Sequence, residues 1–215
     1  TVTASDTYGN TASTGANVTL DLLRPVLTAV TLFGDGLLSA ADALVTQTIT
    51  GTVGNAPVGS TVNVNVGGKI FTGLVAANGT FSINVNPADL RGLADGTLAT
   101  SVTLLTPDGN TSTTTGPSIK VGLTNLPTVA ITSLFGGDGY LSQAEAGVAQ
   151  TISGVSNLAN GTVTLRIGTE TLTGTITNGT WSVSVPSATL KGLTDGGVNV
   201  SVSVRDDVGN VGTGS

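Results

Sequence analysis

The sequence predicts an all-β protein of tandem antiparallel β-sandwich modules, about 100 residues each, arranged in an extended rod. An internal repeat, strand-like alternation of apolar and polar residues, and regularly spaced turn pairs support this prediction. The repeat is clearest at Gly9-Asn10, Gly109-Asn110 and Gly209-Asn210, which recur every 100 residues. A repeat of this length is typical of arrays of small domains.

Two longer stretches carry the same repeat. The segment GTFSINVNPADLRGLADG, from Gly79, matches GTWSVSVPSATLKGLTDG, from Gly179. The segment FGDGLLSAADALVTQTITG, from Phe33, matches GGDGYLSQAEAGVAQTISG, from Gly136. We therefore expect Phe81 and Trp181 at equivalent buried positions, and no helix longer than about three turns.

The individual strands follow from period-2 alternation. VNVNV from Val62, FSINV from Phe81, WSVSV from Trp181 and VNVSVSV from Val198 each place apolar residues on one face. Asn-Gly, Asp-Gly and Gly-Gly pairs separate these runs, as expected for a sandwich. Pro25 and Pro127 mark the two junctions. The predicted boundaries are 1–24 for the last strands of a preceding module, and 25–125 and 126–215 for two whole modules.

The amino-acid composition argues against several classes of function. Cysteine, methionine and histidine are absent, which removes disulfides, thiolate nucleophiles, Cys/His zinc sites and any Ser-His-Asp triad. The net charge of -6 and the pI near 4.2 have the wrong sign for nucleic acid or an anionic membrane. No apolar run is long enough to span a bilayer, and no signal peptide begins at Thr1, so we expect a segment of a longer secreted protein.

The carboxylates gather near the predicted junctions. Loops of a sandwich cluster at its two ends, so we expect the end loop of one module to meet the early loop of the next. Clustered carboxylates need a hard cation, and calcium takes 6–8 oxygen ligands. The candidate calcium ligands are Asp6, Asp21, Asp35, Asp42, Asp108, Asp138, Glu145 and Asp206.

Structural roles for these acids stay open. Asp35, Gly36 and Asp42 match positions 5, 6 and 12 of an EF-hand loop, but positions 1 and 3 would be Thr31 and Phe33, and neither offers a carboxylate. Asp35 and Asp138 could be simple Asp-Gly turn residues. Asp42 and Glu145 could cap a short helical turn or face solvent. Asp95 and Asp195 precede glycines in Leu-rich loops and are interpreted as turn residues.

An active site is not predicted. Without histidine or cysteine, catalysis would need paired carboxylates in a cleft, or a lysine or tyrosine base. The two tyrosines, Tyr8 and Tyr140, do not occupy equivalent positions in the repeat.

The order of motifs resembles a known family. GDGxLSxAEA, then TISG, then Asn-Gly-Thr-Phe/Trp-Ser, then D-x-x-G-N is similar to the bacterial Ig-like extender repeats of giant RTX-type adhesins, over essentially the whole chain. The resemblance implies type I secretion, an extracellular location on the bacterial surface, and calcium within and between modules. It maps the early acidic loop onto Asp35 and Asp42, then Asp138 and Glu145.

The same resemblance places Asp6 and Asp206 in the end loops, and Asp21 just before the linker proline. The second junction departs from the pattern. Thr106 stands at the repeat position that Asp6 and Asp206 hold in the other copies, and Val121 stands at the position of Asp21. Asp108 is the expected substitute there.

The resulting hypothesis is a stalk that projects a distal adhesive domain for attachment or biofilm formation, stiffened by calcium. Its partners would be the neighbouring repeats of the same chain, with no nucleic acid, no membrane insertion and a monomeric state. The alternative is a glycan- or receptor-binding Ig-like module, which 3% aromatic residues disfavour. An accessory domain of a secreted polysaccharide enzyme is a third possibility.

Overall fold

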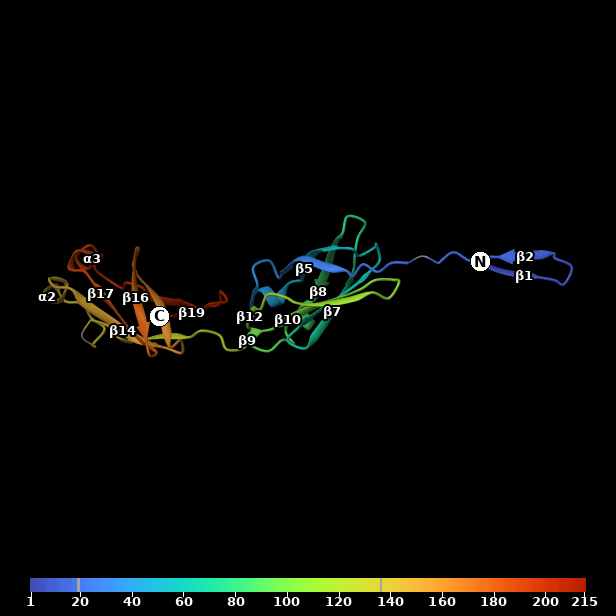
Figure 1. Cartoon of the computed structure of the whole chain (residues 1–215). Coiled ribbons are helices and arrows are strands. Elements are labelled where there is room, and N and C mark those ends of the chain that lie inside the picture. Colours follow the sequence, from blue (N-terminus) through green and yellow to red (C-terminus); the bar gives the residue numbers. More distant parts are fainter. Residues whose placement is uncertain (19, 136) are drawn as a thin grey trace.

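The computed structural model describes residues 1–18, 20–135 and 137–215. It forms a line of three parts: an N-terminal hairpin, a first sandwich and a second sandwich (Figure 1). The hairpin pairs β1 (Val2–Ser5) with β2 (Thr11–Thr14), and all of their residues are exposed. Residues 15–18 and 20–25, between this hairpin and β3, are not part of a helix or strand. The predicted extended array of all-β modules is confirmed.

The first sandwich contains three sheets. One has the order β3-β5-β8, the second β11-β10-β6-β7 and the third β4-β12-β9. Only β4 and β12 pair in parallel among the strand pairs of the described residues. The bounds are β3 (Val26–Leu32), β4 (Leu37–Ser39), β5 (Gln47–Gly54), β6 (Thr61–Val66), β7 (Lys69–Leu74), β8 (Thr80–Val85), β9 (Gly96–Leu98), β10 (Thr100–Leu105), β11 (Thr111–Thr115) and β12 (Ile119–Gly122), with helical turns η1 (Asp42–Leu44) and α1 (Pro87–Leu90).

The second sandwich repeats this plan with one continuous sheet. Its strand order is β13-β14-β17-β16-β15-β18-β19, because the hairpin pair Ile176–Trp181 joins β16 to β17. The bounds are β13 (Val129–Ser133), β14 (Gln150–Ser156), β15 (Asn160–Ile167), β16 (Glu170–Thr177), β17 (Thr180–Val185), β18 (Val200–Arg205) and β19 (Val211–Gly214), with helices α2 (Gln143–Ala146) and α3 (Ser187–Lys191).

Each sandwich has its own hydrophobic core. The first core is built from buried residues between Leu32 and Val121, and the second from buried residues between Val129 and Val204. Phe81 and Trp181 are 2% and 3% exposed, at equivalent places in β8 and β17. The helices described are no longer than five residues. The predictions about the two aromatic residues and helix length are therefore confirmed.

The glycine of the TITG and TISG motifs lets each aromatic ring lie flat on the neighbouring strand. A Cβ added at Gly51 would lie 2.5 Å from ring atoms of Phe81, and one at Gly154 would overlap the Trp181 ring. Gly51 pairs with Phe81 across β5 and β8, and Gly154 pairs with Trp181 across β14 and β17. The repeat therefore conserves a close approach between a ring and a backbone within this chain.

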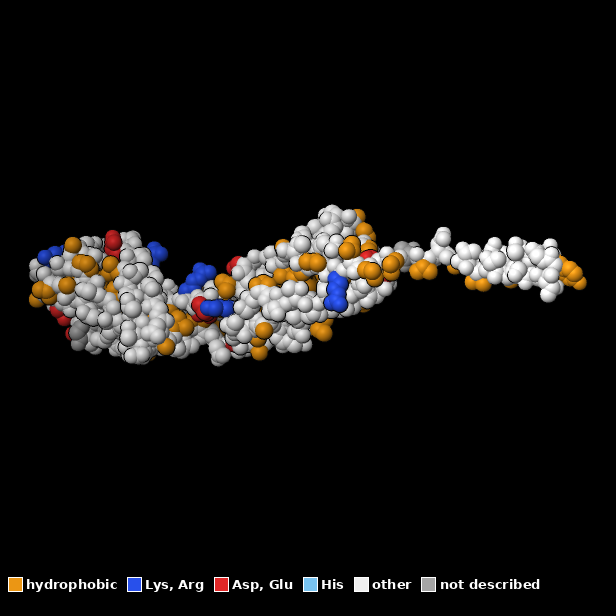
Figure 2. All heavy atoms as spheres, in the orientation of Figure 1, with side chains coloured by type: hydrophobic (Ala, Val, Ile, Leu, Met, Phe, Trp, Pro, Cys, Tyr) orange, Lys and Arg blue, Asp and Glu red, His pale blue; other side chains and the backbone are white. Residues whose placement is uncertain are grey.

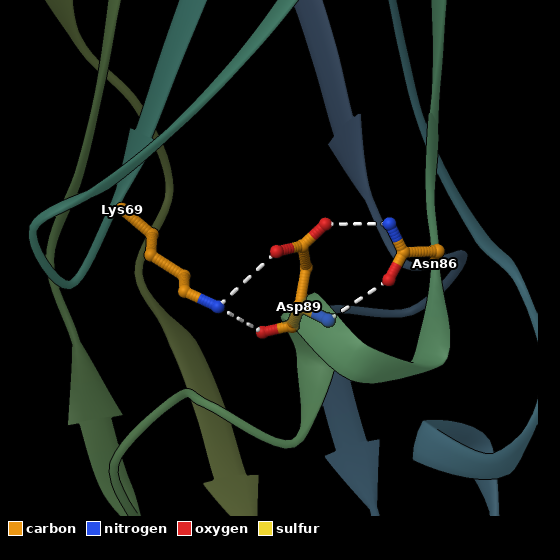
Figure 3. A network of polar contacts seen from close by, with 3 residues as sticks. All are labelled: Lys69, Asn86 and Asp89. Carbon is orange, nitrogen blue, oxygen red and sulfur yellow. Dashed lines mark hydrogen bonds and ion pairs between the residues drawn. The ribbon is translucent and has the colours of Figure 1, made fainter.

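A polar network fixes the connection after β8. Asn86 caps α1 by accepting a hydrogen bond from the backbone N–H of Asp89, at 3.0 Å (Figure 3). The Nζ of Lys69 donates to the backbone carbonyl of Asp89 at 2.7 Å and lies 3.4 Å from its carboxylate. These contacts hold α1, whose Leu90 is fully buried, and so position the loop that follows.

The early loop differs from its predicted alignment. Phe33 and Phe135 are the equivalent residues, because both are buried and both have positive φ angles, 51° and 43°. Such φ angles are unusual for a bulky residue and are tolerated here because the rings are anchored in the cores. Gly136, the start of the second motif in the sequence alignment, lies outside the described residues.

The Gly51–Phe81 contact makes a matched pair of substitutions informative. We expect Gly51→Ala to lower the free energy of unfolding of the first sandwich by about 1–3 kcal/mol, because the methyl group collides with the carbonyl oxygen of Ala29 and with the ring of Phe81. Gly54→Ala is the control on the same strand, since a Cβ there meets nothing within 4 Å. Chemical denaturation followed by circular dichroism measures both; equal effects would contradict the packing argument.

Candidate functional site: the joints between sandwiches

The joint between the two sandwiches is built around Asn210. Its Oδ1 accepts a hydrogen bond from the backbone N–H of Ala40 at 2.9 Å, and its Nδ2 donates to the carbonyl of Gly122 at 2.8 Å. Asn210 is only 8% exposed. The side chain thus binds both the early loop of the first sandwich and the end of β12. The loop that presents Asn210 is ordered by Asp206, whose carboxylate accepts bonds from Val208 and Asn210.

A surface ion pair borders the same joint. Lys120 Nζ lies 2.6 Å from Asp207 Oδ2, and oppositely charged side chains meet at the waist between the sandwiches (Figure 2). The hydrogen bond from Lys120, opposed by partial desolvation, lowers the pKa of Asp207. Both side chains are at least half exposed. Exposed pairs of this kind stabilise by about 0–1 kcal/mol, so Asn210 carries more of the joint.

At the first joint, between the N-terminal segment and the first sandwich, an equivalent asparagine makes a similar contact. Asn110 Nδ2 donates to the backbone carbonyl of Asp21 at 3.1 Å, and Ser112 Oγ donates to the carbonyl of Pro25. Asn110 and Asn210 are equivalent residues of the repeat, and each binds the last carbonyl before a linker. Asp21 therefore corresponds to Gly122, and the segment before Asp21 corresponds to β12.

These contacts reverse the predicted pairing of loops. The early loop of the first sandwich meets the end loop of the second, through Ala40 and Asn210. The end loop of the first sandwich faces the linker on its N-terminal side, through Asn110 and Asp21. The prediction that the Asp6/Asp21 side meets the Asp35/Asp42 side is therefore wrong. The cause is the strand topology of the first sandwich. The loop between the antiparallel strands β10 and β11 lies at the same end of this sandwich as the segment that precedes β3.

Two further details of the sequence alignment are corrected. Thr106, assigned to the second joint, is buried in the end loop that faces the first joint. Val121, assigned to the place of Asp21, is a core residue of β12 and is 4% exposed. Asp108 and Glu145, expected to share the second junction, lie apart, since α2 is at the far end of the second sandwich (Figure 1).

Asp95, interpreted from the sequence as a turn residue, is a clamp on the linker. Its carboxylate accepts hydrogen bonds from three consecutive backbone N–H groups, those of Leu123, Thr124 and Asn125, at 2.6–3.0 Å. The Thr124 hydroxyl donates as well. Burial alone would raise the pKa of Asp95, but these donors outweigh it and hold the pKa far below its ordinary value. The Asp-Gly pair gave no sequence signal for this role.

The acids of the early loops make structural hydrogen bonds. Asp35 and Asp138 each accept the N–H two residues on, from Leu37 and Tyr140. Asp42 and Glu145 accept bonds from the N–H and hydroxyl of the serine three residues earlier. The turn and capping roles that the sequence left open are thus present, and each engages one carboxylate oxygen.

The remaining candidate ligands are distributed between the joints. At the first joint Asn110 donates to the carboxylate of Asp108 and to the backbone carbonyl of Asp21. The hydrogen bond from the hydroxyl of Thr106 is the main cause that lowers the pKa of Asp108. Asp6 lies in the exposed hairpin, where Asn10 lowers its pKa. Within residues 1–18, 20–135 and 137–215, no group of three or more acidic side chains is close enough to hold a metal ion. The oxygen donors suit calcium in kind, but this chain brings together only part of a coordination shell.

Comparison with known proteins gives sequence similarity to bacterial adhesins. No protein-family model and no curated protein sequence matches the chain. A bacterial immunoglobulin-like domain from the M. primoryensis ice-binding adhesin is 34% identical over 43% of this chain and 91% of that domain, with a TM-score of 0.33. Over this part of the chain the sequence is similar to a bacterial immunoglobulin-like domain of a large adhesin.

Two longer adhesin chains are also similar. A Ca2+-stabilized adhesin that helps an Antarctic bacterium reach out and bind ice is 32% identical over 99% of this chain, with a TM-score of 0.49. A 1.5-MDa bacterial ice-binding adhesin is 29% identical over 86% of the chain, with a TM-score of 0.47. The present chain spans 54% and 62% of the lengths of those two chains.

The joint of this Ig-like pair can be tested at Asn210. Asn210→Ala removes two hydrogen bonds across the joint, each worth about 1 kcal/mol. We expect a broader distribution of orientations between the two sandwiches in small-angle scattering. Asn10→Ala is the matched control, because the equivalent asparagine lies in the exposed hairpin and bonds Asp6. Identical scattering of the Asn210 variant and the parent chain would show that Asn210 does not hold the joint.

The Asp95 clamp has an equally close control. Asp95→Ala should lower the free energy of unfolding of the first sandwich by about 1–2 kcal/mol, because three linker N–H groups lose a charged acceptor. Asp195, the equivalent residue, accepts no hydrogen bond from the described residues, so Asp195→Ala should change little. Calorimetry measures both, and fluorescence of Trp181, the sole tryptophan, reports the second sandwich alone.

The same carboxylate gives a pH dependence. Because the pKa of Asp95 is lower in the folded state, its contribution is complete above the ordinary aspartate pKa of 3.8 and is lost as the pH falls below it. The Asp95→Ala variant should lose less stability than the parent between pH 5 and pH 2. Parallel losses in the two proteins would contradict this.

Proposed function

We propose that this chain is a stalk segment of a bacterial surface adhesin, which spaces a distal adhesive domain from the cell for attachment or biofilm formation. The observation that carries the proposal is the construction of the joint. β12 is part of the first core, and its last carbonyl is bound by the second sandwich. A joint built in this way restricts the orientation of one module relative to the next, as a spacer requires.

The similarity to large adhesins supports an extracellular location on the bacterial surface and neighbouring Ig-like repeats as partners. A tetra-tandem repeat in the extending region of a large adhesion protein aligns over 98% of this chain at 22% identity. No helix among the described residues is long and apolar enough to cross a membrane. The proposed role needs no catalytic group, and we propose that the chain is not an enzyme.

Calcium at the ends of the modules is the second part of the proposal. Asp35, Asp42, Asp138 and Glu145 each present a carboxylate with one engaged oxygen. At the first joint Asn110 Nδ2 donates both to the carboxylate of Asp108 and to the backbone carbonyl of Asp21. At the second joint the early-loop acids share the interface with the end loop that Asp206 orders. Backbone carbonyls and water would complete the shell, and the ion would neutralise the acids and stiffen the joint.

Removal of calcium should lower the thermal stability of the protein. At free calcium tenfold above the dissociation constant, each site adds roughly 1.4 kcal/mol, so the melting temperature should fall when EDTA is added. Magnesium should restore little, because it demands a smaller octahedral shell. Calorimetry of the parent and of an Asp35→Asn/Asp42→Asn variant tests this, and a melting curve unchanged by EDTA would exclude calcium.

A second experiment tests the spacer role separately from the role of calcium. Small-angle scattering should give the long maximum dimension of a straight two-sandwich rod, as in Figure 1, when the joint is intact. If calcium stiffens the joint, this dimension should shorten with EDTA. A particle that is compact in both conditions would contradict the spacer role, whereas a long particle indifferent to EDTA would contradict only the role of calcium.

A further inference from the structure

The last strand of the first sandwich lies where tension along the chain would act. β12 leads directly into the linker to the second sandwich, and the chain enters the first sandwich through β3, which is followed by β4. β12 is paired on one side with β4, in parallel, and on the other side with β9. A pull on the two ends of the chain therefore acts on the N-terminal side of β4 and on the C-terminal side of β12.

The parallel direction of β4 and β12 decides how such a pull would separate them. In a parallel pair, the N-terminal side of one strand and the C-terminal side of the other lie at opposite ends. The pull therefore slides the two strands along each other. Hydrogen bonds between strands run across the strand direction, so sliding strains all of them together, whereas peeling breaks them one after another. The three residue pairs between 37–39 and 120–122 thus resist the pull together.

The second sandwich ties the two strands together at their C-terminal ends. Asn210 accepts a hydrogen bond from the N–H of Ala40, the residue after β4, and donates one to the carbonyl of Gly122, the last residue of β12. Val208 packs at the same place, since a Cβ added at Gly122 would lie 2.6 Å from Val208 Cγ2. Val208 is 7% exposed. The loop that carries Asn210 is therefore seated on β12.

An acidic clamp holds the residues after β12 from the other side. Asp95 directly precedes β9, and its carboxylate accepts the N–H groups of the three residues that follow β12 and Gly122, at 2.6–3.0 Å. These linker residues are the first part of the first sandwich to receive tension from the second. The exit of β12 is thus held on the β9 side by Asp95 and on the β4 side by Asn210.

We propose that the β4/β12 pair resists tension along the stalk, and that Asn210 of the following sandwich reinforces this pair. The inference rests on the proposed stalk role, in which the chain is pulled once the distal domain is attached. A sandwich whose neighbour is folded and docked then unfolds more slowly under force than one that has lost this contact. Each joint of the array would therefore strengthen the module before it.

Single-molecule pulling can place tension on the first sandwich alone. The chain contains no cysteine, so one introduced cysteine is a unique attachment point. Handles at the N-terminus and at Asn125→Cys stretch the first sandwich and leave the second one folded beyond the handle. Asn125 is exposed and bonds Asp95 through its backbone N–H, so the substitution keeps the clamp. The rate of unfolding at constant force is the quantity that such an experiment measures.

Asn210→Ala tests the reinforcement from outside the stretched part of the chain. The first sandwich should unfold about 10- to 30-fold faster at the same force, because two hydrogen bonds are lost and each contributes about a factor of five. Asn199→Ala, an exposed asparagine at the other end of β18, is the control and should not change the rate. Fluorescence of Trp181 checks that the second sandwich stays folded. Equal rates for Asn210→Ala and the parent chain would overturn the reinforcement.

Gly122→Ala removes the same contact from the side of the first sandwich. Its methyl group would collide with Val208 and lie close to Asn210, and so displace the docked loop. We expect faster unfolding under force, whereas Gly54→Ala, whose Cβ meets nothing within 4 Å, is the matched control. In the double variant Gly122→Ala/Asn210→Ala the two factors should not multiply, because both substitutions remove one contact. Factors that multiply would contradict a shared bridge.

The direction of the pull tests the β4/β12 pair itself. Handles at Leu44→Cys and Asn125→Cys lie at the same end of the pair, so the pull peels β12 away from β4, beginning at Gly122. Leu44 is 66% exposed and accepts a handle without disturbing the core. This geometry should release β12 at a several-fold lower force than handles at the N-terminus and Asn125→Cys. Equal forces would overturn the role of the pair, while the length of the unstretched particle decides the spacer role independently.

Discussion

The structure depends on one strand that serves two modules. β12 completes the first sandwich by burying Ile119 and Val121, and its final carbonyl is the acceptor for Asn210 of the second. The linker that follows is held by Asp95 through three backbone N–H groups. Short linkers between domains are flexible by default. Here the start of the linker is fixed, because β12 belongs to the first core and its last carbonyl is bound by the second sandwich.

Neutral hydrogen bonds hold the described joint more than charges do. Asn210 is nearly buried and satisfies both its oxygen and its nitrogen across the interface, whereas the Lys120–Asp207 pair is exposed and screened by salt. The acids nearby orient loops: Asp206 presents Asn210, and Asp42 ties back to Ser39. An ion would therefore bind to loops that are already shaped, which lowers the entropic cost of ordering them.

The two sandwiches differ chiefly at the ends of the repeat. Their central strands align closely, and both place an aromatic ring against a glycine of the neighbouring strand. In the first sandwich β4 and β9 both pair with β12 and not with each other. The equivalent segments of the second sandwich, Tyr140–Ser142 and Gly196–Val198, are not part of a strand. The edge of the first sandwich is thus completed by the segment that leads into the second.

The sequence by itself determined the class of the fold, the repeat and the core. Period-2 alternation places Val62, Val64 and Val66 on one face whatever the surrounding structure, and the repeat fixes Phe81 and Trp181 as equivalent. It also found the acidic loops, since carboxylates are scarce in this chain. Only the tertiary structure decided which loops meet, because the direction in which a hairpin loop returns depends on strand order and not on local pattern. For the same reason Asp95 and Asn210 escaped notice: each acts on residues far away in the sequence, at separations of 28 to 30 residues for Asp95 and 170 for the contact of Asn210 with Ala40.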